Sequence, residues 1–168
     1  MSWPGRLALL SLALGLASAS LASQVYQAQV TSVIDGDTVW VRVDGESQRR
    51  KLRILGIDAP EICQAGGRAS RLAMRSLVLG KRVLVSQTGV DTFGRGLAML
   101  QRDGVDVAAQ LVMDGHAWAA GVALHGQSYR EQEASARQGR RGLFAADRPQ
   151  WPGDFRKQHG SCYATRTP

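Results

Sequence analysis

Hydrophobic and polar positions alternate along three short segments near the start of the chain. These are residues 25–33, 39–43 and 49–57. Period-two alternation is typical of strands with one buried face. The dipeptides Asp35-Gly36 and Asp44-Gly45 separate the segments and favour tight turns. The pattern therefore predicts a meander of three strands, which is the usual start of a small barrel.

The hydrophobic period changes over residues 65–79, where apolar positions recur three and four apart. This spacing predicts a helix that ends at Gly80. The face expected to point inward contains Ala69, Leu72, Ala73, Ser76 and Leu77. Segments 83–87 and 97–101 are two further strand candidates, which brings the predicted number of strands to five.

Two more helices are predicted from their capping residues. Asp106 is a candidate N-cap for a short helix that closes at Gly115. Ser128 and Glu131 have the spacing of a capping box for a last helix. Residues beyond Pro149 predict a non-repetitive tail. The expected fold class is α+β, mainly β, with a five-stranded barrel and about three packed helices.

The first 22 residues have the pattern of a signal peptide. Arg6 supplies a positive charge, residues 7–17 are apolar, and small residues permit cleavage after Ala19 or Ala22. An uncleaved membrane anchor is the alternative, but the apolar run is shorter than the ~20 residues that span a bilayer. We predict a signal peptide over 1–22, a folded domain over 23–148 and a tail over 149–168. The protein is then secreted or periplasmic, without stable membrane association once the leader is cleaved.

The chain is basic, with a formal net charge of +7. Loss of the predicted leader lowers this by one, because Arg6 is its only charged residue. A basic balance on a small domain favours polyanionic partners. Two basic groups are candidate surfaces for a nucleic-acid backbone, although each also fits an ordinary solvated face: residues 49–51, and the stripe Arg68, Arg71 and Arg75.

Two cysteines, Cys63 and Cys162, are far apart in the chain. An exported protein meets an oxidising environment, which favours a disulfide between them. Two unpaired thiols are the alternative. A zinc site is not indicated, because His116, His125 and His159 show no ligand spacing with either cysteine.

Several carboxylates stand where the predicted strands begin and end. Asp37 follows the first turn, and Asp58 and Glu61 follow the third strand segment. A single aspartate at such a place is usually a turn residue, but clustered carboxylates require a compensating charge. Oxygen-only ligands favour Ca²⁺ or Mg²⁺ over zinc.

Arg53 lies in the same stretch as these carboxylates. It shares strand parity with Leu55 and Ile57, and if those two face the barrel interior, Arg53 is expected to point inward near the mouth. There it would pair with a carboxylate alone, or with a bound phosphate that has this carboxylate nearby. Together these residue types indicate a metal-assisted site for cleaving phosphodiesters.

Three segments carry a family resemblance. They are 35–39 (DGDTV), 53–61 (RILGIDAPE) and 91–97 (DTFGRGL). In this order they resemble the signature blocks of the thermonuclease, or staphylococcal nuclease-like, family, over about Val25 to Phe144. The resemblance implies an OB-fold barrel of five strands. It also implies Ca²⁺-dependent hydrolysis of DNA and RNA at the P–O5′ bond, which leaves 3′-phosphate ends, and we expect a monomer.

The resemblance also implies residue roles. Asp37, Asp58 and the backbone carbonyl of Ala59 would bind Ca²⁺. Glu61 would be the general base, and Arg53 and Arg95 would bind phosphate and stabilise the transition state. A rival hypothesis is a non-catalytic OB-fold module that binds nucleic acid, which would be expected to lose part of this set. All of its members are present here.

The chain departs from better-known members at positions that concern substrate binding. Ala59 stands where many relatives have threonine, which leaves a carbonyl ligand intact. Thr92 and Phe93 replace lysine and tyrosine. Candidates for a replacement stacking surface, which also fit core or tail packing, are Trp118, Tyr129 and Trp151.

Overall fold

The structure is a computed structural model that describes residues 23–121, 126, 128–160 and 162. The predicted signal peptide and its cleavage positions at Ala19 and Ala22 lie outside the described residues, as does His125. Within the described part of the chain, no helix has both the length and the apolar character needed to cross a membrane.

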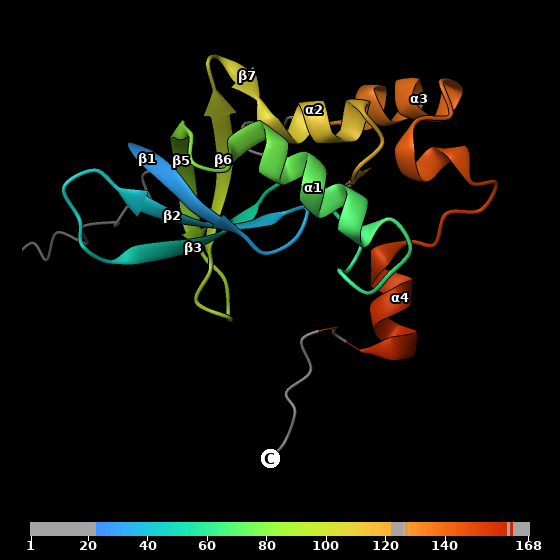
Figure 1. The fold of residues 1–168 in the computed structure, drawn as a ribbon, viewed down its shortest axis with the longest axis horizontal. Coiled ribbons are helices and arrows are strands. Elements are labelled where there is room, and N and C mark those ends of the chain that lie inside the picture. The colour runs from blue at the N-terminus through green and yellow to red at the C-terminus, as the bar shows by residue number, and fades with distance from the viewer. Residues whose placement is uncertain (1–22, 122–125, 127, 161, 163–168) are drawn as a thin grey trace, which may run out of the picture.

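Five strands close into a mixed β-barrel, as predicted (Figure 1). Their order around the barrel is β3-β2-β1-β5-β6, and a parallel pairing of β6 with β3 completes the circle. All other barrel pairings are antiparallel. The strands are β1 (Gln24–Val33), β2 (Thr38–Val43), β3 (Arg49–Ile54), β5 (Arg82–Val90) and β6 (Gly96–Arg102).

The third predicted strand is divided in two by a turn at Leu55-Gly56. After it, β4 (Ile57–Asp58) pairs with β8 (Trp118–Ala119) away from the barrel. Leu52 and Ile54 are the buried residues of β3. The expectation that Arg53 points into the barrel was therefore wrong. Its side chain lies on the outer face, because alternate residues of a strand point to opposite sides.

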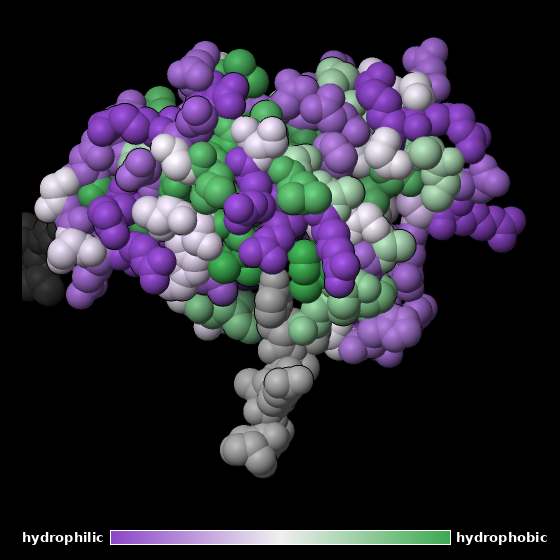
Figure 2. Space-filling view, viewed as in Figure 1, coloured by the Kyte–Doolittle hydropathy of each residue, from purple (hydrophilic) through white to green (hydrophobic). Residues whose placement is uncertain are grey.

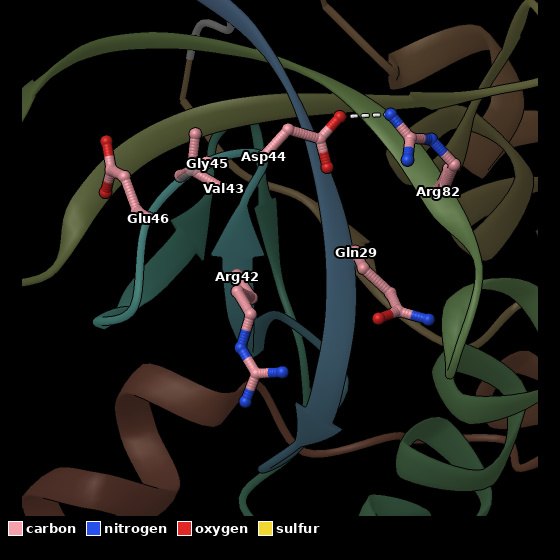
Figure 3. Close-up of a pocket in the computed structure, with 7 residues that line it drawn as sticks. All are labelled: Gln29, Arg42, Val43, Asp44, Gly45, Glu46 and Arg82. Carbon is pink, nitrogen blue, oxygen red and sulfur yellow. Dashed lines mark hydrogen bonds and ion pairs between the residues drawn. The ribbon is translucent and has the colours of Figure 1, made fainter.

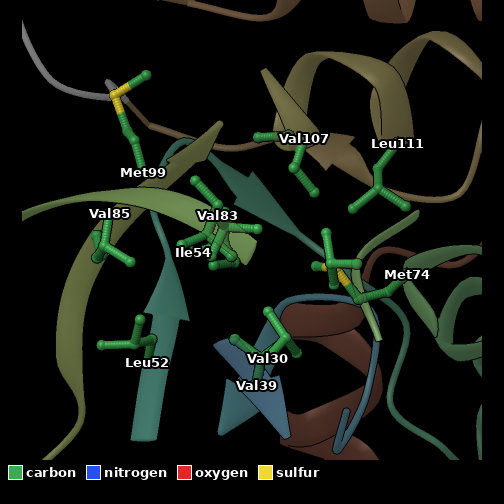
Figure 4. Close-up of a cluster of buried hydrophobic side chains, with 14 of the residues drawn as sticks. Val30, Val39, Leu52, Ile54, Met74, Val83, Val85, Met99, Val107 and Leu111 are labelled. Atoms are coloured by element: carbon green, nitrogen blue, oxygen red, sulfur yellow. The ribbon is translucent and has the colours of Figure 1, made fainter. Parts of the chain in front are cut away.

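The core fills the barrel and extends under two helices, α1 (Gly67–Val78) and α2 (Val107–Met113). Figure 4 shows Met74 of α1 and Leu111 of α2 among the strand side chains. The predicted inward face of α1 was right only in part. Ala73 and Leu77 pack against the core, but Leu72 is 64% exposed and the buried positions are Gly67, Ser70, Met74 and Val78. Two of these four are small, so their burial follows from close packing instead of side-chain hydrophobicity. The Ser70 hydroxyl donates to the His116 carbonyl at 2.6 Å.

The capping predictions had different outcomes. Asp106 caps α2 as predicted, by accepting from the amides of Ala108 and Ala109. It also ends the short strand β7 (Val105–Asp106). The capping box at Ser128 was wrong, because α3 (Arg130–Gln138) follows Tyr129 and has no side-chain cap. The Tyr129 hydroxyl instead donates to Asp106 at 2.8 Å, and burial together with this carboxylate raises the pKa of Tyr129.

The segment after Pro149 is not a non-repetitive tail. It contains α4 (Pro152–His159), so the described residues hold four α-helices, together with the short 3₁₀ helix η2 (Gly142–Ala145). The predicted disulfide between Cys63 and Cys162 is present, with a Cα–Cα distance of 5.8 Å. In Figure 1, α4 lies beside the loop that leads into α1. Residues about 100 positions apart in the sequence therefore meet at one side of the barrel.

Candidate active site

The first turn of the barrel holds Asp37 in place. Asp35 accepts a hydrogen bond from the Asp37 amide at 3.1 Å, and the Asp37 carbonyl accepts from the Ile54 amide at 2.8 Å. A Cβ at Gly36 would overlap the Ser70 hydroxyl, so only glycine permits this approach of the turn to α1. The turn thus carries Asp37 to the end of β3.

The Asp37 carboxylate is buried and fully engaged. One oxygen accepts from the Thr38 hydroxyl at 3.0 Å, and the other accepts from the Ala59 amide at 2.8 Å. The second oxygen also lies 3.0 Å from Arg53 Nη1. Burial raises the pKa of Asp37 to about 6, although Arg53 and the Ala59 amide act in the opposite direction. This carboxylate would therefore gain from a further positive charge.

Arg53 joins two carboxylates on the outer face of the barrel. Its Nη2 lies 3.2 Å from Asp58 Oδ1, and its Nη1 donates to the carbonyls of Ile54 and Ile57 at 2.9 and 3.0 Å as well as contacting Asp37. These two carbonyls flank the turn at Leu55-Gly56, so backbone and side-chain acceptors fix the guanidinium together. The carboxylates of Asp37 and Asp58, both buried, thus share the guanidinium of Arg53.

Glu61 lies in the loop between β4 and α1. Its amide donates to Gln64 Oε1 at 3.2 Å, and its carboxylate is mostly shielded from solvent. Gly67, the first residue of α1, packs so closely that a Cβ there would overlap the Glu61 carbonyl. The start of the helix therefore sets the position of this loop.

Arg156 of α4 is the residue that sequence reasoning missed. Its Nη2 lies 2.9 Å from Asp58 Oδ2, and its Nη1 lies 3.2 Å from both Asp58 Oδ1 and Glu61 Oε1. The hydrogen bonds to Asp58 raise the pKa of Arg156 above its already high value, so it stays charged. A signal for its helix was present: Pro152 at the first turn, Asp154 next to it and basic residues in the last turn.

Arg95 lies at the tight turn between β5 and β6, where Gly94 has a positive φ. Its Nε donates to Asp91 Oδ2 at 2.7 Å, and its guanidinium lies 5.2 Å from the centroid of the Phe93 ring. Burial alone would raise the pKa of Asp91, but hydrogen bonds from Arg95 and Phe93 outweigh it and lower that pKa. The parallel pairing of Leu97 with Arg53 brings this turn to the strand that carries the first arginine.

The structure thus brings together Asp37, Arg53, Asp58 and Glu61, whereas Arg95 contacts Asp91 in the neighbouring turn. No group of three or more His, Cys, Asp or Glu side chains is arranged around one cation position in the described ranges. The two carboxylates that share Arg53, those of Asp37 and Asp58, offer oxygen donors only. Such a set fits a hard cation that completes its coordination with water and substrate oxygens.

A separate hollow of about 330 Å³ lies between β1, β2 and β5 (Figure 3). Its two acidic residues are already paired, Asp44 with Arg82 and Glu46 with Arg50. Arg42 and Gln29 complete its polar lining. Because its acids are neutralised by neighbouring arginines, this hollow lacks the unbalanced negative charge of the carboxylate cluster at Asp37.

The predicted surfaces for a nucleic-acid backbone are partly occupied by internal contacts. Arg50 lies over the Tyr26 ring, and the Arg71 Nε donates to the Val33 carbonyl at 3.1 Å. Among the stacking candidates, Trp118 and Tyr129 are buried and serve packing. Phe93, in contrast, is 80% exposed. Figure 2 shows hydrophilic residues at both ends of the face in view and smaller hydrophobic groups between them.

Comparison with known proteins agrees with this architecture. Residues 51–146 match the family described as staphylococcal nuclease homologue. The chain is 34% identical to a micrococcal nuclease of Shigella flexneri, over 79% of this chain and 81% of that protein. It is 32% identical to an uncharacterized endonuclease of Haemophilus influenzae, over 77% of this chain and 72% of that protein. A probable staphylococcal-like nuclease of rice, CAN1, is 33% identical over 66% of this chain, which spans only 34% of that longer protein.

A five-stranded barrel with clustered carboxylates and arginines on its outer face defines a protein of the nuclease-like OB class. Within that class, the chain belongs to the staphylococcal nuclease family. It is a staphylococcal-nuclease-like nuclease, that is, a phosphodiester hydrolase with nucleic-acid substrates.

Proposed function

We propose that this protein is an exported, Ca²⁺-dependent nuclease that hydrolyses DNA and RNA at the P–O5′ bond and leaves 3′-phosphate ends. The observation that carries this proposal is the placement of two buried carboxylates, Asp37 and Asp58, on one guanidinium with Glu61 beside them. Carboxylates in such an arrangement attract a divalent cation, and an arginine at the same position attracts a phosphate.

In this proposal, Asp37, Asp58 and the Ala59 carbonyl hold the cation. When bound, Ca²⁺ supplies positive charge that polarises the phosphodiester and neutralises charge developing on its oxygens. Asp37 is already oriented for this task by the Thr38 hydroxyl and the Ala59 amide. The raised pKa of Asp37 means that a cation would also favour its ionised form.

Glu61 is the proposed general base, which accepts a proton from the attacking water. Its carboxylate is joined to Asp58 through Arg156 Nη1, so it lies near the proposed cation position. Arg53 and Arg95 are the proposed phosphate ligands. The planar fork of an arginine can meet two non-bridging oxygens at once and stabilise the negative charge that grows on them in the transition state.

Export is proposed from the leader pattern and is supported by the disulfide, which is typical of oxidising compartments. The sequence alone also allowed a non-catalytic OB-fold module that binds nucleic acid. The carboxylates and both arginines favour the enzyme, because a module that only binds nucleic acid has no need of a general base or a cation site.

The direct test is a nuclease assay of the purified mature protein on plasmid DNA and on RNA, with Ca²⁺ and then with a chelator. Asp37→Ala and Asp58→Ala should abolish hydrolysis while circular dichroism remains unchanged. Asp147→Ala is the matched control, because its side chain is 88% exposed and pairs with Arg140 away from the site. Products whose 3′ ends can be labelled only after phosphatase treatment carry 3′-phosphates, as proposed. Full activity in excess chelator would refute the Ca²⁺ requirement.

A further inference from the structure

The segment from Gln150 to Gly160 together with Cys162, here called the C-terminal strap, is fastened to the loop that carries Glu61 at three points. Gln64 Nε2 donates to the Gln150 carbonyl at 2.7 Å. Arg156 contacts Asp58 and Glu61, and the disulfide joins Cys162 to Cys63. The strap therefore places one guanidinium on the carboxylate cluster from the far end of the sequence.

Arg156 uses much of the capacity of Asp58 to accept further partners. An ionised carboxylate offers about four lone-pair positions. In Asp58, Oδ1 accepts from Arg53 and Arg156, and Oδ2 accepts from Arg156 again. About one position is left. A metal ion that binds Asp58 through both carboxylate oxygens must therefore displace the Arg156 guanidinium.

The positive charges around Asp58 favour the same conclusion. Two guanidinium groups, Arg53 and Arg156, already contact this one carboxylate. A divalent cation on Asp58 would be a third positive group at the same side chain, in a partly buried place. Two positive groups that share one carboxylate at short distance repel each other strongly where solvent is scarce.

We infer that Arg156 is a built-in counter-ion that competes with the divalent cation for Asp58 and thereby sets the cation affinity of the active site. This inference rests on the proposed metal site. Arg156 has neither the role of a metal ligand nor that of a proton carrier; it acts through Asp58 and Glu61.

The anchors of the strap make this competition effective. Trp151, just before α4, packs edge-on against the buried Trp118 with ring centroids 5.8 Å apart. The disulfide holds the other end of the strap. A group tethered on both sides has a high effective concentration at its target. The cation must therefore displace a side chain that cannot diffuse away, and loosening one anchor should favour the cation.

Calorimetric titration with Ca²⁺ at fixed ionic strength tests the inference. The proteins are the wild type, Arg156→Gln and the matched control Lys157→Gln, which removes the same charge from the same helix at a side chain that pairs with Asp154. Arg156→Gln should bind Ca²⁺ about five- to tenfold more tightly, as expected for loss of a partly exposed ion pair with charge-assisted hydrogen bonds. Lys157→Gln should change the affinity by less than about twofold. Arg156→Lys should lie between, since lysine cannot hold Asp58 through two nitrogens.

The outcomes separate the inference from the function on which it rests. Equal or weaker Ca²⁺ affinity in Arg156→Gln, in a protein whose circular dichroism matches the wild type, overturns the inference and leaves the nuclease proposal intact. Failure of every protein to bind Ca²⁺ overturns the proposed metal site and the inference with it. Asp58→Asn should lose binding in both backgrounds, which identifies the site that is being titrated.

A second arm loosens the strap at its disulfide and compares the effect in the wild type and in Arg156→Gln. Reduction of the disulfide, or the double substitution Cys63→Ser and Cys162→Ser, should raise Ca²⁺ affinity in a chain that keeps Arg156. The same change should have little effect in the Arg156→Gln background, because the competing group is already gone. An equal effect of reduction in both backgrounds would mean that the strap acts on the cation by another route, and would overturn the role given to Arg156.

Discussion

Arg53 connects several parts of the site, because its two terminal nitrogens contact two carboxylates and two backbone carbonyls. Such a pattern requires a planar group with several fixed donors. A lysine would keep the charge and lose the geometry. Arg95 has a smaller set of partners, yet it too is fixed by the carboxylate of Asp91.

The first prediction at this scale concerns those two arginines. Arg53→Lys and Arg95→Lys should each lower kcat about 100-fold at saturating Ca²⁺, since removal of one such group from a preorganised site commonly costs about 3 kcal/mol. Steady-state hydrolysis of a short DNA substrate measures the effect. Arg82→Lys is the control, because Arg82 pairs with Asp44 in the hollow described above. Near wild-type turnover in either variant would remove that arginine from the catalytic proposal.

A second prediction follows from the raised pKa of Asp37. Its folded-state pKa is about 6, above the ordinary 3.8. Between these values the native state keeps a proton that the unfolded chain has lost, so the free energy of unfolding falls as pH rises through the interval. Asp37→Asn should remove this fall, which is about 3 kcal/mol.

Urea unfolding of both proteins in chelator, at pH values across that interval, measures the difference. The Asn variant is the reference for the wild type, because it keeps all the other titrating groups. A pH dependence of stability that is the same in wild type and Asp37→Asn would show that this carboxyl is ionised normally in the native state.

Phe93 gives a third prediction. The ring is exposed beside Arg95, and exposed aromatic rings offer stacking surfaces for unpaired bases at about 1–3 kcal/mol per base. Phe93→Ala should raise KM for single-stranded substrates at least about fivefold with little change in kcat. Phe93→Tyr keeps the ring and should behave like the wild type. A change confined to kcat would contradict a stacking role.

At the scale of the elements, the position of the loop between β4 and α1 is set by close packing against the first residue of α1, Gly67. Gly67→Ala would place a Cβ against the Glu61 carbonyl, where backbone must move to make room. The gain in helix propensity from alanine, about 0.5–1 kcal/mol, is smaller than the typical 1–3 kcal/mol cost of such overpacking. The variant should therefore lose stability and also turnover, because Glu61 shifts.

Thermal unfolding and kcat measured on the same preparation test this prediction. Gly89→Ala is the matched control, since a Cβ at Gly89 meets nothing within 4 Å. Unchanged turnover in Gly67→Ala, with stability lowered, would mean that the Glu61 backbone position is not critical for the reaction.

The strands, and the cap at Asp106, could be predicted because their signals are local: alternation, turn dipeptides and one capping carboxylate. The buried face of α1 could not, because Gly67 is buried by close packing against the Glu61 carbonyl, and Ser70 by packing against Gly36 and the His116 carbonyl. No hydrophobic period reveals such contacts. The side to which Arg53 points could not be predicted either. The turn at Leu55-Gly56 ends β3, so Leu55 and Ile57 do not continue the alternation of the strand that carries Arg53.

For the site, the resemblance to a nuclease family pointed to the residues that meet on the outer face of the barrel. Arg156 could not be found this way, because its contact with Asp58 spans 98 positions of sequence and arises only when the strap docks. The local signs of α4 were present in Pro152 and the basic last turn, yet they predict a helix and say nothing about its partner.

At the scale of the whole molecule, the disulfide closes a loop of 99 positions. In the chain-entropy description a loop of this length contributes up to ~4–5 kcal/mol. Reduction should therefore lower the melting temperature, and should also lower kcat at saturating Ca²⁺, because the bond restrains the loop that carries Glu61.

The double variant Cys63→Ser and Cys162→Ser, treated with and without reductant, is the control for side effects of the reductant. Intact-mass analysis after alkylation of the non-reduced protein counts the thiols. Two alkylated thiols on the monomer would contradict the disulfide itself, and an unchanged kcat after reduction would contradict its link to Glu61.

The distance between the two cysteines also sets an order of events during synthesis. At roughly 5–20 residues per second, Cys162 is added roughly 5 to 20 s after Cys63. Once Arg102, the last residue of β6, has been added, and until Arg156 is added, the nascent chain contains all five barrel strands and the carboxylates Asp37, Asp58 and Glu61 but lacks Arg156. The newborn domain then has its acidic cluster without the strap's guanidinium, and Cys63 as an unpaired thiol. Completion of the last turn of α4 and oxidation of the cysteines would be the finishing steps of maturation, after which the cation has a competitor.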